Sequence, residues 1–378
     1  MIAVTASHIL IEGQWKQTYY LIIEGGVIRQ IVSRDNLPSA IEIKNFGDGY
    51  LVPGYFDIQV NGGGDRLIND TPTPECILDI SNAHLPFGST SLLPTLITDQ
   101  TDKMKTVAES VEALRASGHK FVRGIHFEGP FINEKRKGVH HAAFIRKAEE
   151  IFLNLIDEYD FGACLVTLAP EQVPFDFIRE LRKRNVVISM GHTEASYDTC
   201  MAAIQNGATG FTHLFNAMPP FLSRDPGPIG AAFSSNQAFA SVIADGHHIH
   251  AASLQSALKL MGPERSMLIT DAMPPVGGKL DNFTLENLPV SVTDGRCVTE
   301  NGTLAGAAIS MEDAVVYCMN KLDIPMAAAA KMASETPATF MFLQDTIGRF
   351  KVGADADMVL LNGAGNILFS QRGMNLEG

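Results

Sequence analysis

The sequence has few cysteines and no cysteine motif. Its 378 residues include five, and no two are spaced as C-x-x-C: Cys76, Cys164, Cys200, Cys297 and Cys318. An odd, scattered set of thiols argues against a disulfide framework and against a zinc site made of thiolates. Reduced thiols are typical of the cytoplasm, which is the location that we expect.

The sequence also lacks long uncharged apolar runs. The first fifteen residues, MIAVTASHILIEGQW, have no basic lead and no apolar block, so they favour a strand over a signal peptide. No segment reaches the length of a transmembrane helix. We therefore expect no membrane association.

Positive charge is scarce as well. The chain has 29 Lys and Arg against 42 Asp and Glu, a formal net charge of −13. This balance disfavours nucleic acid and anionic membranes as partners, so an acidic substrate needs a local cluster of positive groups. Neither a Walker loop nor a strand-linked G-x-G-x-x-G is present, and nucleotide binding has no support.

Apolar residues are abundant, at 46% of the chain, which is enough for a large core. Between the two ends, apolar runs alternate with helical stretches such as EQVPFDFIRELRKR and LQSALKLMG. There are eight such runs: YLVPGYFDIQV, STSLLPTLIT, FVRGIHFEG, CLVTLAP, NVVISMGH, ATGFTHLF, FASVIADG and SMLITDAM. Apolar strands that alternate with helices indicate a parallel sheet, and eight units predict an α/β fold of the (β/α)8 TIM-barrel type.

Both ends of the chain are β-rich. The stretch TYYLIIEGGVIRQIV contains two apolar runs separated by Gly25-Gly26, which is a hairpin signal, and GRFKVGADADMVLLN and ILFSQRGMNL resemble it near the other end. We predict that the two ends pair as one small β domain. The expected division is 1–52 for its first part, 53–341 for the barrel and 342–378 for its second part.

Polar residues gather where the predicted barrel strands end. In such a barrel the carboxyl ends of the strands carry the active site. Those ends carry Gln59, Asn61, Glu128, His192, His213, His248 and Asp271. Each alone has an ordinary explanation, such as a solvated loop carboxylate, a core histidine or a helix cap. Together they predict an active site.

Glu128, His192 and His213 predict a metal site. Two neutral imidazoles and one carboxylate form a catalytic zinc set with one open position. The same ligands suit iron, cobalt or manganese, so the pattern leaves the identity of the divalent metal open. Asp271 is then a candidate general base for water that the metal activates, and a candidate acid for the leaving amine.

The first barrel strand ends in DIQVN, where a metal-binding strand would carry His-x-His. Gln59 and Asn61 point the same way, because residues two apart on a strand share a face. Neutral amides are much poorer metal ligands than imidazole, so we predict one metal ion per chain. The amides are then free to orient ligands, water or substrate. The alternative is that they only satisfy backbone groups at a turn.

A second group of polar residues lies on loops beyond the strand ends. His140 is in GVHH, Asn216 and Arg224 are in FNAMPPFLSRDPG, and ADGHHIH contains His248. An arginine, a histidine and an asparagine near one another suit a phosphate group. For Arg224 alone, a solvated loop position is an equally good explanation.

Several stretches together resemble the N-acetylglucosamine-6-phosphate deacetylase family of the amidohydrolase superfamily. They are VPGYFDIQVNGGGD, HFEGPFINEKRKGVHH, MGHTEASYD, THLFNAMPP, ADGHHIH and TDAMPPVG, and TLAGAAISMEDAV and SETPATFMFLQDTIGRFKVGADADMVLL extend the likeness over nearly the whole chain. The resemblance implies a (β/α)8 barrel with a small β-sandwich built from both termini. It also implies hydrolysis of the acetamide of N-acetyl-D-glucosamine 6-phosphate to glucosamine 6-phosphate and acetate, in amino-sugar catabolism.

The resemblance also implies residue roles. It gives metal ligation to Glu128, His192 and His213, acid–base catalysis to Asp271, and a place near the sugar and its acetyl group to His140. It assigns phosphate or sugar contacts to Asn216, Ala217, Arg224 and His248. A homodimer is expected in which the arginine reaches into the neighbouring site, and members with Gln-x-Asn on the first strand hold one metal. His247 and His250 depart from the family pattern.

Two other functions stay open at this point. Another amidohydrolase that acts on a different amide usually depends on a first-strand His-x-His or on a carbamylated lysine, and no lysine ends a predicted strand here. A catalytically inactive sugar-phosphate-binding protein would not need Asp271 and all three ligands. Release of acetate distinguishes these alternatives.

Overall fold

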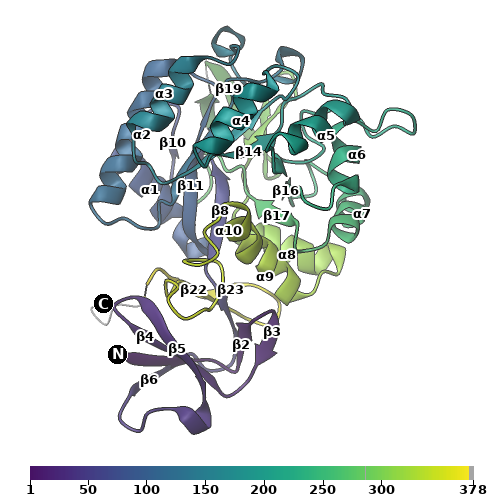
Figure 1. Ribbon diagram of the computed structural model, residues 1–378. Coiled ribbons are helices and arrows are strands. Elements are labelled where there is room, and N and C mark those ends of the chain that lie inside the picture. Colours follow the sequence, from purple (N-terminus) through teal and green to yellow (C-terminus); the bar gives the residue numbers. More distant parts are fainter. Residues whose placement is uncertain (286, 374–378) are drawn as a thin grey trace.

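The computed structural model describes residues 1–285 and 287–373 of the chain. Its centre is a parallel sheet of eight strands, hydrogen-bonded in the order β17-β16-β15-β14-β13-β12-β11-β8 (Figure 1). A parallel bridge between Val60 and Ala272 links the two outer strands and nearly closes the sheet into a barrel. The strands are β8 (Tyr55–Val60), β11 (Ser89–Ile97), β12 (Gly124–Glu128), β13 (Ala163–Leu168), β14 (Val187–Met190), β15 (Gly210–Phe211), β16 (Phe239–Ile243) and β17 (Ser266–Ile269). The eight predicted runs contain these strands in order, so the predicted barrel is confirmed.

Helices surround the barrel. They are α1 (Pro74–His84), α2 (Thr101–Ala116), α3 (Glu150–Glu158), α4 (Phe175–Lys183), α5 (Tyr197–Gln205), α6 (Gly227–Ser234), α7 (Ala251–Met261), α8 (Met311–Leu322), α9 (Met326–Ala333) and α10 (Glu335–Phe340). Short 3-10 turns occupy η1 (Arg34–Asn36), η2 (Leu85–Phe87), η3 (Glu134–Arg136) and η4 (Ala142–Phe144). None of the helices described is long and apolar enough to cross a lipid bilayer.

Local sequence explains where these helices begin and which face they bury. Helix α8 begins at Ser310, whose hydroxyl accepts from the Asp313 amide while Asp313 accepts from the Ser310 amide, a reciprocal capping box. Helix α2 buries one stripe, with residues three or four apart: Met104, Val107, Ala108, Val111 and Leu114. The stripe packs into the apolar core that the barrel and its helices share.

Two smaller sheets lie below the barrel in Figure 1, and the N-terminus lies among their strands. One has the order β5-β4-β1-β6 and the other β23-β22-β7-β2-β3. Their strands are β1 (Ile2–Thr5), β2 (His8–Ile11), β3 (Gln14–Lys16), β4 (Tyr19–Glu24), β5 (Val27–Ser33), β6 (Glu42–Asn45), β7 (Tyr50–Pro53), β22 (Met358–Leu361) and β23 (Ile367–Gln371).

The two chain ends pair with each other, as predicted. Antiparallel β7 and β22 place Leu51 opposite Leu360. The predicted hairpin between β4 and β5 also forms, and Gly25 and Gly26 take the positive φ angles that its turn requires. The exact boundaries of the three predicted parts stay a prediction, and residues 374–378 of the last part lie outside the described residues.

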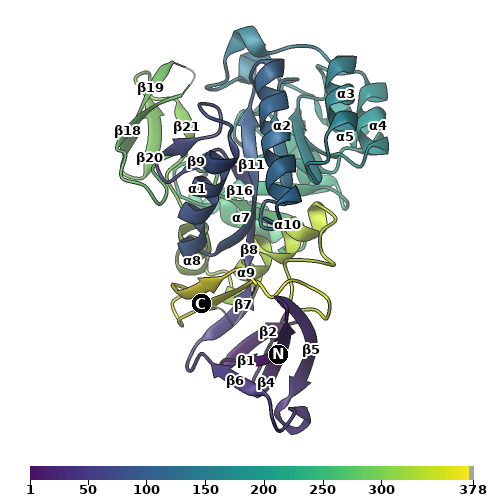
Figure 2. The same ribbon diagram turned by 90° about the vertical axis from the view of Figure 1, so that its left-hand side faces the viewer.

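A third small sheet was not expected from the sequence. It follows β17 and has the order β18-β19-β20-β21, with strands β18 (Asn282–Leu285), β19 (Leu288–Thr293), β20 (Arg296–Thr299) and β21 (Leu304–Ala307). Figure 2 shows it at the end of the barrel far from the two terminal sheets. A two-stranded ladder, β9 (Gly62–Gly63) with β10 (Arg66–Leu67), extends from the end of β8. The inserted sheet buries its own small apolar cluster, which also includes Met273.

Candidate active site

The three predicted metal ligands meet at the carboxyl end of the barrel. The Nε2 atoms of His192 and His213 lie 3.1 and 3.0 Å from Oε1 of Glu128, and 3.1 Å from each other. The three residues are only 6%, 4% and 3% exposed, in the order His192, His213 and Glu128. The structure therefore brings together a buried carboxylate and two imidazoles that come from three different strands.

The backbone aims these side chains in a common way. His192, His213 and Asp271 each lie two residues beyond the last residue of β14, β15 and β17. Their φ angles are 48°, 34° and 49°, in the left-handed region that residues with side chains rarely adopt. Such conformations gather at functional sites, where the surrounding structure holds them in place.

Specific contacts hold the two histidines. The hydroxyl of Ser241 accepts a hydrogen bond of 2.8 Å from the backbone amide of His213. Beside His192, the carboxylate of Glu171 accepts from the Thr193 hydroxyl at 2.5 Å and from the Glu194 amide at 2.7 Å. Glu171 follows the end of β13, and the sequence analysis did not identify it.

The cluster fits a divalent metal. The carbonyl oxygen of Arg136 can only accept, and it lies 2.8 Å from Nδ1 of His192, so Nδ1 carries the hydrogen. In the neutral ring the lone pair of Nε2 then points at the carboxylate oxygen of Glu128, an unfavourable arrangement unless a cation lies between them. In His213, Nδ1 is buried and has no partner among the described residues, so Nε2 is the ring atom assigned to bind the metal.

Charge within the cluster supports the same conclusion. Burial alone would raise the pKa of Glu128, but the two neighbouring imidazoles of His192 and His213 hold it well below its usual range. Glu128 is therefore a buried anion. A buried anion needs a compensating cation.

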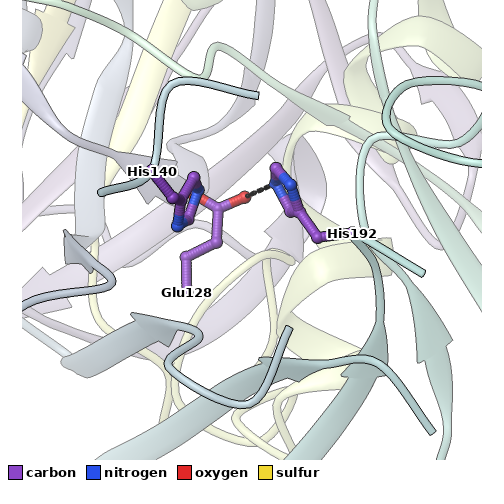
Figure 3. Close-up of side chains that lie close together, drawn as sticks. All are labelled: Glu128, His140 and His192. Carbon is purple, nitrogen blue, oxygen red and sulfur yellow. Dashed lines mark hydrogen bonds and ion pairs between the residues drawn. The ribbon is translucent and has the colours of Figure 1, made fainter. Parts of the chain in front are cut away.

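His140 is a further histidine close to this cluster. One ligand atom of each of Glu128, His140 and His192 lies within 4.8 Å of the others, and Figure 3 shows the Glu128 carboxylate directed at His192 with His140 on its other side. However, Nδ1 of His140 lies 2.8 Å from the Thr98 hydroxyl. Burial, and then the neighbouring His192, lower the pKa of His140 to about 3, so its ring is neutral. We therefore assign His213, which directly contacts both other ligands, to the ligand set.

The amides of β8 contact carboxylates rather than backbone groups. The Gln59 side-chain amide donates to Glu128 Oε1 at 3.0 Å and to Asp271 Oδ1 at 3.1 Å. The Asn61 amide donates to the same Asp271 oxygen at 2.6 Å. Gln59 thus links the candidate metal ligand Glu128 to the candidate acid–base group Asp271, and Asn61 contacts Asp271.

Asp271 presents one oxygen to the cavity. Both amide bonds go to Oδ1, whereas Oδ2 has no partner in the part of the chain that the structure describes. Burial raises the pKa of Asp271, and the charge of Glu128 adds to this shift. A carboxylate with a raised pKa and a free oxygen is suited to accept and return a proton.

A cavity of about 470 Å³ opens above these residues. Its wall includes the predicted site residues Asn61, Glu128, His140, His192, His213, Asn216, Ala217, His248 and Asp271. It also includes Lys135 and Arg136, which the sequence analysis did not single out, and the segment 302–304 of the inserted sheet. The charges of a local KRK run were visible in the sequence, but their position at this wall was not.

Arg224 is placed differently. It is exposed on the loop before α6 and is not part of the cavity wall of its own chain. Phe221 and Leu222, on the same loop, are 55% and 54% exposed. His247 and His250 are also exposed, and His250 caps the start of α7.

The chain is similar to known proteins over most of its length. Residues 50–376 match the Amidohydrolase family. An N-acetylgalactosamine-6-phosphate deacetylase of Shewanella sp. is 39% identical over 83% of this chain and 79% of its own length. An N-acetylglucosamine-6-phosphate deacetylase of Vibrio furnissii is 32% identical over 94% of this chain and 90% of its own. The crystal structure of N-acetylglucosamine-6-phosphate deacetylase from Pasteurella multocida, 29% identical, superimposes with a TM-score of 0.94 over 98% of both chains.

Proposed function

The chain belongs to the amidohydrolase family, and we propose that it is a deacetylase of N-acetyl-D-glucosamine 6-phosphate in amino-sugar catabolism. The observation that carries the proposal is the buried Glu128, His192 and His213 cluster beside the free oxygen of Asp271. In the reaction, water adds to the acetyl carbonyl carbon and the C–N bond breaks. The nitrogen gains a proton, and acetate and glucosamine 6-phosphate leave.

One divalent metal ion is proposed per chain, held by Glu128, His192 and His213. Zinc suits two imidazoles and a carboxylate, and iron, cobalt and manganese suit them as well. When bound, the ion supplies Lewis-acid activation of water and of the amide carbonyl.

Asp271 is proposed as the acid–base residue. Asp271 lies in the cavity wall, where Gln59 and Asn61 fix its Oδ1 and Oδ2 has no hydrogen-bond partner among the described residues. The carboxylate takes a proton from the attacking water and passes it to the departing nitrogen. Such positioned proton transfer contributes about 10²–10⁴-fold to a rate.

Gln59 and Asn61 are proposed to replace a second metal. The Gln59 side-chain amide bridges the Glu128 and Asp271 carboxylates. Its N–H groups offset the repulsion between the carboxylates without adding a positive charge. The proposal therefore explains how a Gln-x-Asn strand serves a site with one metal.

Substrate contacts are proposed for the other residues of the cavity wall. His140, with its neutral ring, is placed to hydrogen-bond the sugar or its acetyl group. Asn216, Ala217 and His248 are proposed to contact the sugar or its phosphate. A phosphate group requires positive charge close to it. Because the chain has a net charge of −13, this charge must come from residues near the site.

Arg224 is proposed to act in the site of a partner subunit, within a homodimer. Its exposure outside its own cavity supports this role, and the exposed apolar residues Phe221 and Leu222 on the same loop suit an interface. The test mixes Arg224→Ala protomers with Asp271→Asn protomers, each of which is impaired alone. Hybrid dimers should recover part of the activity. Absence of recovery, when subunit exchange is demonstrated, would show that each site is complete within one chain.

A second substrate is the C4 epimer, N-acetyl-D-galactosamine 6-phosphate. It is favoured by the 39% identity to the Shewanella enzyme, against 29–34% for the relatives named for the glucosamine substrate. Acetate release from both 6-phosphates and from plain N-acetylglucosamine decides the matter. We expect kcat/KM to be higher for the phosphorylated sugars. No acetate from either 6-phosphate, with a fully loaded metal site, would leave a different amide or an inactive binding protein as the explanation.

A cytoplasmic location is also proposed. The five cysteines are free thiols, and all are buried. Such thiols are typical of a reducing compartment.

A further inference from the structure

Asp245 lies in the turn after β16 and makes three hydrogen bonds there, one with His247 and two with His248. Its Oδ1 accepts from the backbone amides of His247 and His248 at 2.8 and 2.9 Å. Its Oδ2 lies 2.6 Å from Nδ1 of the His248 ring. The Asp245 side chain is 1% exposed and does not belong to the cavity wall, whereas His248 does.

These contacts determine which ring nitrogen of His248 carries a hydrogen and which is left to contact a ligand. Burial alone would raise the pKa of Asp245, but hydrogen bonds from the ring and the two amides bring it below its usual range. The carboxylate is therefore an acceptor only, and Nδ1 of His248 carries a hydrogen. Nε2 has no partner among the described residues, so it is the ring atom left for a ligand.

The turn itself is rigid. Gly246 has a φ of 77°, and a Cβ added there would lie 2.8 Å from the hydroxyl oxygen of Tyr317. Asp245 and the His248 backbone are thus held within one tight turn, packed against α8. The ring cannot change its direction without breaking the 2.6 Å contact.

We propose that Asp245 is a positioning residue, which holds His248 so that Nε2–H points into the cavity and donates to the phosphate group of the substrate. The ring then lies between two anions, donating from Nδ1 to Asp245 and from Nε2 to phosphate, which requires the doubly protonated, cationic ring that two anions stabilise. This inference rests on the proposed function. It adds an anchor for the phosphate that lies within the same chain, in contrast to Arg224.

The test is Asp245→Asn. The Asn oxygen still accepts from the two backbone amides, so the turn is kept, but an NH2 group now faces Nδ1 of His248 and forces the hydrogen onto Nε2 alone. The ring loses its anionic partner. Nε2–H can still donate to the phosphate, but from a neutral ring. We therefore expect KM for the 6-phosphate substrate to rise about tenfold, the size expected when a hydrogen bond loses the charge of its donor. We expect kcat to stay within about threefold, and activity on plain N-acetylglucosamine to be unchanged.

Two controls separate positioning from a merely structural role. Asp313→Asn is the matched variant, because Asp313 also accepts from a backbone amide and a hydroxyl, in the cap of α8. It should leave KM unchanged. In a His248→Gln background, Asp245→Asn should add little, because the residue that it positions is gone. In addition, ¹⁵N NMR of labelled histidines should show that Nδ1 of His248 loses its proton in Asp245→Asn.

Unchanged KM in Asp245→Asn, or an equal loss of affinity in the His248→Gln background, would overturn the inference. An equal loss on the plain sugar would overturn it too. These outcomes differ from failure of the proposed function, in which the wild-type protein itself releases no acetate from the 6-phosphates.

Discussion

Replacement of Asp271 by asparagine tests the catalytic proposal most directly. Oδ1 of Asp271 accepts from the Gln59 and Asn61 amides, and the Asn oxygen can keep both bonds. The free Oδ2 becomes an NH2 group, which cannot accept a proton. Because burial raises the pKa of Asp271, the change also removes an unfavourable buried charge, and the fold should not lose stability.

The expected magnitude follows from this geometry. Acid–base catalysis by a positioned side chain is worth about 10²–10⁴-fold, or about 2.7–5.5 kcal/mol of barrier. The retained Oδ1 bonds keep the residue in place, so the loss should appear in kcat, with KM changed by less than about threefold. Metal ligation does not involve Asp271 in our assignment, so metal content should be unchanged.

The assay is steady-state acetate release, with metal content by elemental analysis and Tm measured on the same preparation. Asp57→Asn is the matched control. Asp57 is a buried carboxylate on β8, but both of its oxygens already accept, from the Thr270 hydroxyl at 2.5 Å and from the backbone amide of Gln59 at 3.2 Å. It should retain kcat within a few-fold. A fall in kcat of less than about tenfold in Asp271→Asn, with metal and Tm unchanged, would refute the acid–base assignment.

Three further predictions follow from other residues. Arg224→Ala should raise KM for the 6-phosphate substrate and remove much of the enzyme's preference for that substrate over the plain sugar. Arg224→Lys should restore only part of this preference, because lysine lacks the planar guanidinium group that can donate two hydrogen bonds to a phosphate. An unchanged preference in Arg224→Ala would contradict a phosphate contact. Gln59→His combined with Asn61→His should raise the metal content from one to two ions per chain by elemental analysis, whereas two ions in the wild-type site would disprove the single-metal proposal. His84→Gln should flatten the loss of Tm between pH 6.5 and 4. Burial lowers the pKa of His84 to about 4, so its contribution to stability is present above pH 6.5 and is lost as pH falls towards 4; an equally steep loss in the variant would show that His84 is not responsible.

The sequence by itself determined the barrel and most of its site. Strands that are buried on both faces need continuous apolar sequence, and the eight apolar runs in the sequence predicted the eight barrel strands in order. Parallel strands bring their carboxyl ends to one edge, so residues as far apart as Glu128 and His213 were expected together before any distance was known. The Gly25-Gly26 hairpin followed from local backbone chemistry.

Only the tertiary structure decided which side chains touch. Gln59 and Asp271 are 212 residues apart in sequence, and no periodicity states that an amide would bridge two carboxylates. The inserted sheet after β17 was missed, because its short strands are half-exposed and lack the continuous apolar run of a barrel strand. The family resemblance placed Arg224 in a neighbouring site, and the structure leaves it outside the cavity of its own chain. Periodicity records whether a residue is buried, whereas a catalytic contact depends on distances of about 3 Å, which the packing of distant segments sets.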